Sequence, residues 1–205
     1  MKNGHYRLHI DGVWQSGELG FKDVTDPSTE EVVAEVSVAG PGDLDRAIAA
    51  AVRARGAWAD TDVRKRAEVL ERAAEILAGK AGEVSRRMVR EQGKTLAEAS
   101  GELQRAQETF SWNAQHAEAL CKPVRIDDRR TLLLHPVGIV AAFTPWNYPA
   151  VLIARKLAPA LAAGCTVILK AAEEAPAAPV AIVETLQEAG IPTGVVALVF
   201  VDPPM

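Results

Sequence analysis

The last third of the chain alternates apolar runs with helical segments, and this alternation is the feature that most limits its possible folds. Three runs have the continuous hydrophobicity of parallel strands that are buried on both faces, and they span residues 137–143, 166–169 and 195–201. The segments between them, 149–163 and 176–189, have helical spacing, and each ends at a glycine. The order strand, helix, strand, helix, strand predicts half of a doubly wound nucleotide-binding sheet.

The residues before this unit divide into an extended part and a helical part. Residues 6–38 contain short alternating apolar patterns and turn signals, which predict β-strands. Across 43–120 the apolar residues repeat at helical spacing, and a first helix is expected to open at 42–43. Gly79 and Gly82 are expected to interrupt the second helix. We expect the whole helical region to pack on one face of the sheet.

The charge balance gives no support for a nucleic-acid or an anionic-membrane partner, because both would favour a basic excess. The formal net charge is −4 and the isoelectric point is about 5.6. The apolar runs stop short of the roughly 18 residues that a membrane span needs, and the N-terminus lacks the apolar run of a signal peptide. Two cysteines are too few for a disulfide framework, and the four histidines lack metal-ligand spacing. We therefore expect a cytoplasmic protein without a metal site.

One group of candidate site residues follows the first strand of the unit. Ligands of open parallel sheets bind beyond the carboxyl ends of the strands, and residues 144–149 occupy this position. Two prolines restrict the backbone around Trp146 and Asn147. A held Asn147 amide can donate an N–H to an oxygen that becomes negative in a transition state. The alternative is that Asn147 is a helix N-cap and that Trp146 serves packing.

A second group, Lys170 and Glu173, follows the second strand. An acidic residue at this point of a nucleotide-binding unit commonly binds the adenosine ribose hydroxyls, and Lys170 can reach the same ribose or a phosphate. The alternative is a solvated charge pair at a strand end. The sequence contains no Gly-x-Gly-x-x-Gly, so an ordinary Rossmann phosphate loop is absent and a dinucleotide would have to be held another way.

Several of these residues belong to one spaced pattern. The pattern consists of Pro145-Trp-Asn-Tyr-Pro149, Lys156, Ala163-Gly164 and Lys170. With it, residues 135–176 closely resemble the NAD(P)-dependent aldehyde dehydrogenase superfamily, and in particular its succinate-semialdehyde dehydrogenases. Weaker matches extend the resemblance toward the N-terminus, at residues 9–14, 26–32 and 91–95.

The resemblance implies a role for each matching residue. Asn147 corresponds to the asparagine of the oxyanion hole, and Lys170 and Glu173 correspond to the pair that binds the adenosine ribose. Because a carboxylate at Glu173 would repel the 2′-phosphate of NADP, NAD is the expected cofactor and NADP the less favoured one. Positions that line the cofactor site correspond to Thr144, Pro145 and Trp146.

Two basic residues follow this pattern on the predicted helix. Arg155 corresponds to a position that points into the aldehyde channel of succinate-semialdehyde-type members, where a guanidinium can pair with a substrate carboxylate. The alternative is an exposed helix arginine. Lys156 corresponds to a lysine near the active site, to which we assign no role.

The expected fold class follows from the same resemblance. It is α/β and aldehyde dehydrogenase-like, with a partial doubly wound (Rossmann-like) parallel sheet, N-terminal strands and a helical region. Three parts are expected: 1–121, which packs on the cofactor domain; 122–135, a β-hairpin of the kind that pairs with a neighbouring subunit; and 136–205, the first half of the dinucleotide-binding sheet. A three-stranded half-sheet would leave apolar surface uncovered.

Family chains are much longer, so the catalytic domain with its nucleophilic cysteine and general-base glutamate is expected to be absent from this chain. Cys121 and Cys165 are expected to be buried, inert thiols. The predicted function is the cofactor-binding portion of a homo-oligomeric enzyme that oxidises a small aldehyde, such as a semialdehyde, to a carboxylate. The alternative is a catalytically inactive remnant that only binds nucleotide or self-associates.

Overall fold

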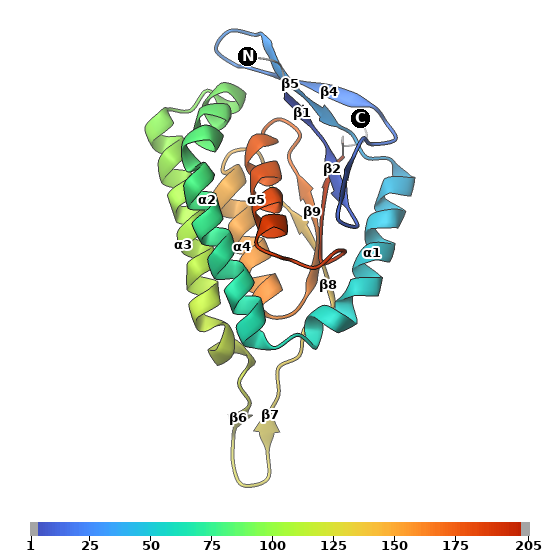
Figure 1. Cartoon of the computed structure of the whole chain (residues 1–205), viewed down its shortest axis with the longest axis vertical. Helices are drawn as coiled ribbons and strands as arrows, with labels where there is room; N and C mark the ends of the chain where they lie inside the picture. The colour runs from blue at the N-terminus through green and yellow to red at the C-terminus, as the bar shows by residue number, and fades with distance from the viewer. Residues whose placement is uncertain (1–3, 202–205) are drawn as a thin grey trace.

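The computed structural model describes residues 4–201 and has an α/β architecture built around a central sheet (Figure 1). The strands are β1 (Gly4–Tyr6), β2 (Leu8–Ile10), β3 (Val13–Gln15), β4 (Phe21–Thr25), β5 (Val32–Ser37), β6 (Val124–Arg125), β7 (Thr131–Leu132), β8 (Ile139–Phe143), β9 (Thr166–Ala171) and β10 (Val196–Phe200). The helices are α1 (Pro41–Ala59), α2 (Val63–Gln92), α3 (Leu96–Cys121), α4 (Pro149–Ala162) and α5 (Ala177–Glu188). The order β8, α4, β9, α5, β10 confirms the predicted alternation.

The central sheet combines this C-terminal unit with two N-terminal strands. Its strand order is β3-β2-β10-β9-β8, in which β8, β9 and β10 are parallel and β2 runs antiparallel to β10. Leu8, His9 and Ile10 of β2 are all buried. The N-terminal strands therefore cover the edge of β10 that a three-stranded unit would expose. A smaller sheet, β1-β5-β4, lies above the central sheet in Figure 1.

The expectation that residues 137–143 are buried on both faces is wrong. β8 is an edge strand, and Val137 and Phe143 are 85% and 67% exposed. Ala141 and Phe143 share one face of β8 and are exposed, whereas Ala142 on the other face is buried. Apolar surface is left uncovered here, as expected of a partial sheet.

The helices lie in layers on both sides of the central sheet (Figure 1). α1 packs on one face, and α4 and α5 pack on the other. α2 and α3 form an outer layer that contacts α4 and α5. The expectation that the helical region packs on one face of the sheet is therefore wrong. None of the helices within residues 4–201 has the length and hydropathy to cross a membrane.

Two expectations about helix ends also need correction. α1 begins at Pro41, and the Asp43 carboxylate accepts a hydrogen bond from the Gly40 N–H (2.9 Å) rather than standing at the N-cap. α2 continues through Gly79 and Gly82 without interruption. An interior glycine costs about 1 kcal/mol, which a long buried face of α2 readily offsets. The helix ends at Gly93, which adopts a left-handed conformation with φ +68°.

The N-termini of α4 and α5 lack caps of their own. Tyr148 at the α4 N-cap makes no capping hydrogen bond through its side chain within the described chain, and α5 follows Pro176. Carboxylates from the outer layer supply the missing acceptors. Glu102 of α3 accepts hydrogen bonds from the N–H groups of Ala150 (2.7 Å) and Val151 (3.3 Å), and Glu91 of α2 accepts one from Ala177 (3.0 Å).

At the C-termini of two helices, a buried guanidinium donates hydrogen bonds to the free backbone carbonyls. Arg66 of α2 is 5% exposed. Its Nε donates to the carbonyl of Ala162 at the end of α4 (3.0 Å), and its Nη1 donates to the carbonyls of Ala59 (3.2 Å), at the end of α1, and Thr61. One cation thus joins α1, α2 and α4 where the orphan carbonyls of two helices meet.

The predicted β-hairpin is present as β6 and β7, which extend away from the body of the molecule at the foot of Figure 1. Its apolar side chains are exposed, and they are Val124, Ile126, Leu132, Leu133 and Leu134.

Replacing Arg66 tests the junction of the helix C-termini. Arg66→Met leaves the carbonyls of Ala59 and Ala162 buried without their donor, so we expect the free energy of unfolding to fall by about 2–4 kcal/mol. The measurement is chemical denaturation followed by circular dichroism. Arg72→Met, at an exposed position of the same helix, is the control and should leave the midpoint unchanged. Equal midpoints for the two variants would contradict this role.

Glu91 gives a second test, through pH. Desolvation raises the pKa of its carboxyl from the ordinary 4.5 to about 8. Between these values the folded protein holds a proton that the unfolded chain has lost, so this group's contribution to stability falls as pH rises through the window. In this window Glu91 lowers the free energy of unfolding by at most about 1.4 kcal/mol per pH unit. Glu91→Gln should remove this pH dependence. Chemical denaturation at pH 5, 6.5 and 8 measures the free energy of unfolding of each protein. The control is Glu75→Gln, at an exposed position. If the free energy of unfolding changed with pH equally in wild type and Glu91→Gln, the prediction would be refuted.

Candidate functional site

The two predicted groups of site residues lie next to each other at the carboxyl ends of β8 and β9. Phe143 is paired with Lys170 in the parallel register, and the Thr144 N–H donates to the Lys170 carbonyl (3.1 Å). Thr144 is 6% exposed, and its Oγ1 is buried without a hydrogen-bond partner in the described part of the chain. This unsatisfied hydroxyl lies at the sheet edge where ligands of parallel sheets bind.

Lys170 and Glu173 form an ion pair at the end of β9. Lys170 Nζ lies 3.1 Å from Glu173 Oε2. Because Glu173 is 4% exposed, the alternative of a solvated charge pair is wrong for its carboxylate. Its other oxygen, Oε1, lies 3.5 Å from Nζ of Lys22 on β4. Sequence reasoning missed Lys22, since a lysine in an alternating strand is indistinguishable from an ordinary solvent-facing one.

The segment around Asn147 is exposed and is held through its backbone. Lys94 Nζ donates to the Asn147 carbonyl (3.3 Å), and Gln92 Nε2 donates to the Trp146 carbonyl. Tyr148 occupies the N-cap of α4 and Trp146 is 59% exposed, so the alternative of a capping asparagine beside a packed tryptophan is wrong. Asn147 lines a hollow of about 250 Å³ together with residues of the α2–α3 turn. Its side-chain amide makes no hydrogen bond within residues 4–201.

Arg155 and Lys156 are both exposed on α4. Arg155 lines a different hollow of about 410 Å³, beside Arg105 and Trp112 of α3. Arg105 also lines the hollow at Asn147, so the two hollows adjoin. The structure therefore places Arg155 next to the Asn147 hollow but not in it.

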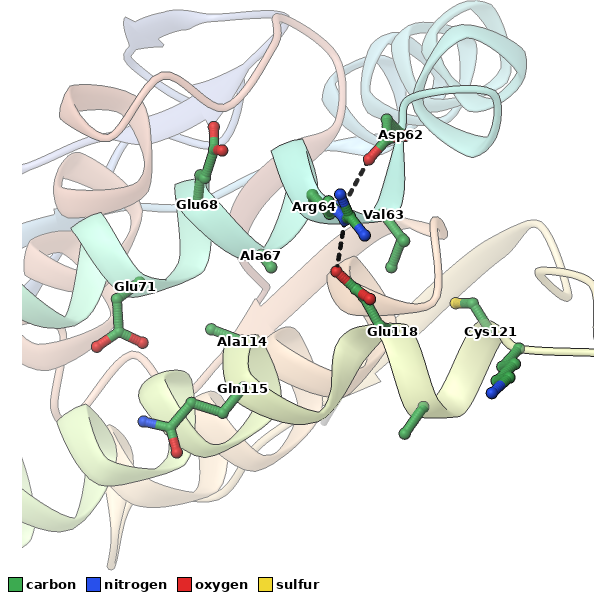
Figure 2. Close-up of a pocket in the computed structure, with 12 residues that line it drawn as sticks. Asp62, Val63, Arg64, Ala67, Glu68, Glu71, Ala114, Gln115, Glu118 and Cys121 are labelled. Atoms are coloured by element: carbon green, nitrogen blue, oxygen red, sulfur yellow. Dashed lines mark hydrogen bonds and ion pairs between the residues drawn. The ribbon is translucent and has the colours of Figure 1, made fainter.

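Another hollow, of about 1080 Å³, lies between α2 and α3, away from these residues (Figure 2). It is open and lined by charges of both signs, among which Arg64 and Glu118 pair at 2.7 Å. Cys121 lines one end of it and is only partly buried, with Arg66 Nη2 3.6 Å from its sulfur. The expectation of a buried thiol therefore fails for Cys121, whereas Cys165 is 3% exposed. No residue of the predicted site lines this hollow.

Comparisons with known proteins agree with one family. The model of the aldehyde dehydrogenase family matches residues 14–203. The chain is 40% identical over 198 residues to the glutarate-semialdehyde dehydrogenase of Pseudomonas putida KT2440, which covers 94% of this chain and 41% of that protein. It is 37% identical over 191 residues to the succinate-semialdehyde dehydrogenase of Escherichia coli K12, named for NADP(+), covering 91% and 40%.

Comparison with solved structures also indicates this family. The crystal structure of an E. coli NADP-dependent enzyme superposes with a TM-score of 0.93 at 34% identity, covering 98% of this chain and 43% of that one. The chain thus spans about two fifths of the length of the curated relatives it matches. A family model that matches nearly the whole chain, together with this structural agreement, shows that the chain belongs to the aldehyde dehydrogenase family.

Proposed function

We propose that this chain supplies the adenosine-binding half of the cofactor site and one oxyanion donor of an aldehyde dehydrogenase. The observation that carries the proposal is the Lys170–Glu173 pair, which lies beside Thr144 at the carboxyl edge of the sheet; the buried Thr144 hydroxyl has no partner among residues 4–201. The nicotinamide cofactor would accept hydride when bound. Lys170 and Glu173 would hold its adenosine ribose, and Thr144, Pro145 and Trp146 would line the site, largely through their backbone.

In this proposal the Asn147 amide donates an N–H to the substrate oxygen as it becomes negative. The whole enzyme would oxidise an aldehyde to a carboxylate. We infer that the nucleophilic cysteine and the general base belong to the part of the relatives that this chain does not match. Cys165 is buried, and Cys121 lies against Arg66 in a hollow that the predicted site residues do not line.

The choice between NAD and NADP depends on the charges around Glu173. Its carboxylate would repel a 2′-phosphate, which favours NAD. Lys22 and Lys170 lie 3.5 and 3.1 Å from the same carboxylate and reduce that repulsion. We propose NAD as the preferred cofactor and Glu173 as the residue that determines the ratio of the affinities for NAD and NADP.

The proposed substrate is a small semialdehyde. Two relatives are named for glutarate and succinate semialdehyde, both of which carry a carboxylate. Arg155 and Arg105 lie beside the hollow at Asn147 and would attract such a group. Arg155 is therefore the proposed substrate-binding residue.

A calorimetric titration with NAD and NADP tests the cofactor half. We expect the chain to bind NAD, and Lys170→Met to weaken binding at least tenfold, because a charge-assisted hydrogen bond contributes about 1.5–3 kcal/mol. Glu173→Gln should shift the preference toward NADP. Lys156→Met, exposed on α4, is the control and should bind as wild type does. A folded chain that binds neither nucleotide would refute the proposal, and aldehyde turnover by this chain would refute the location of the nucleophile.

The alternative function, an inactive module that self-associates, is favoured by the hairpin of residues 122–135. The hairpin exposes three consecutive leucines, Leu132, Leu133 and Leu134. Such apolar surface is typical of an interface, and we propose that this hairpin mediates homo-oligomer formation in either case. A folded chain that self-associates but binds neither NAD nor NADP would favour the inactive, self-associating module.

Replacing leucines in the hairpin tests the oligomer. Leu132→Asp with Leu134→Asp should lower the sedimentation coefficient at micromolar concentration by converting oligomer to monomer, because two charges would be buried in the interface. Leu96→Asp, at an exposed apolar position of α3, is the control. An unchanged oligomer in the hairpin variant would place the interface elsewhere.

A further inference from the structure

One buried carboxylate accepts hydrogen bonds from the first two backbone N–H groups of α4, which the nearby Asn147 side chain could otherwise bind. Glu102 is 1% exposed, and its Oε1 accepts from the N–H groups of Ala150 (2.7 Å) and Val151 (3.3 Å). Pro149 has no N–H, so these are the first two donors of α4. The N-cap residue Tyr148 offers no side-chain acceptor to these donors, and Asn147, one residue before it and three before Ala150, is the nearest side chain along the chain that carries one. In this structure Glu102 has taken that place.

The same carboxylate is tied to the loop through Lys94. Glu102 Oε2 lies 2.6 Å from Lys94 Nζ, whose side chain is 14% exposed. That ammonium also donates to the Asn147 carbonyl (3.3 Å) and lies 5.4 Å from the centroid of the Tyr148 ring. Charged groups of α3 and the α2–α3 turn therefore fix the backbone from the Asn147 carbonyl to the start of α4, while Asn147 itself is exposed.

We propose that Glu102 and Lys94 are positioning residues for Asn147. Glu102 satisfies the α4 donors, which prevents the Asn147 amide from folding back as a helix cap. Lys94 neutralises Glu102 and holds the Asn147 carbonyl, so the amide is presented to the reacting oxygen. A carboxylate suits this place because the helix N-terminus favours an anion. The functional meaning of this arrangement rests on the proposed function, but the competition for the α4 donors can be measured without it.

Hydrogen exchange at the Ala150 amide, followed by NMR, tests the competition. We expect Glu102→Ala alone to accelerate exchange less than tenfold, because Asn147 takes over as the acceptor. Asn147→Ala alone should change it little. The double variant should accelerate exchange far more than the product of the two single effects, since neither acceptor remains. Multiplicative effects would overturn the proposal.

The Asn147 amide gives an independent readout. The chain has three asparagines, at positions 3, 113 and 147, so selective labelling gives few signals and Asn147→Asp assigns one. We expect Glu102→Ala to shift the Asn147 side-chain signals and Glu102→Gln, which keeps an acceptor oxygen, to restore them. Glu108→Ala, exposed on the same helix, is the matched control. An unmoved Asn147 signal in folded Glu102→Ala would overturn the proposal.

Lys94 is tested by the mobility of the loop. Lys94→Met should lower the backbone order parameter at Asn147 from about 0.85 to below about 0.6, whereas the exposed Lys65→Met should not. An unchanged order parameter would remove Lys94 from the proposal. The proposed ribose pair, Lys170 and Glu173, lies at the end of β9 rather than on the loop, so an NAD titration of the wild type tests the proposed function separately. Loss of NAD binding in wild type would therefore refute the proposed function and leave the positioning role standing.

Discussion

Buried ionisable side chains at helix ends hold the layers of this molecule together. Glu91 and Glu102, from the outer helices α2 and α3, accept the first backbone donors of α5 and α4. Arg66 of α2 donates to the last carbonyls of α1 and α4. The Glu102 carboxylate and the Arg66 guanidinium each have the charge that complements the helix end they meet, and Glu91, whose pKa is raised to about 8, accepts from α5 through Oε2. Apolar packing alone would bring these helices together without fixing their ends.

This arrangement explains why the candidate site stands where it does. The loop 144–148 follows β8 and leads into α4, so whatever fixes the start of α4 also fixes the loop. Lys94 and Glu102 act at this point, one on the loop carbonyl and the other on the helix donors. Glu91 acts in the same way at α5, which begins a few residues after Glu173. Packing of the outer layer and geometry of the site are thus parts of the same set of contacts.

The uncovered surface agrees with the length of the chain relative to its family. Phe143 is exposed at the open edge of β8, and the leucines of the hairpin, which precedes β8 in the chain, are exposed as well. The other edge of the parallel unit is covered by β2. An apolar edge strand is unfavourable in water, so these surfaces are where further protein would be expected to pack.

The sequence by itself determined the alternation of strands and helices, the family, and the neighbourhood of Asn147, Lys170 and Glu173. Hydrophobic periodicity is local, and the carboxyl ends of parallel strands share an edge, so these features can be inferred along the chain. Only the tertiary structure decided that β8 is an exposed edge, that α1 lies opposite α4, and that Glu102 and Lys22 reach the site. Pairing between residues far apart in sequence leaves no periodic pattern, because it depends on how the layers meet.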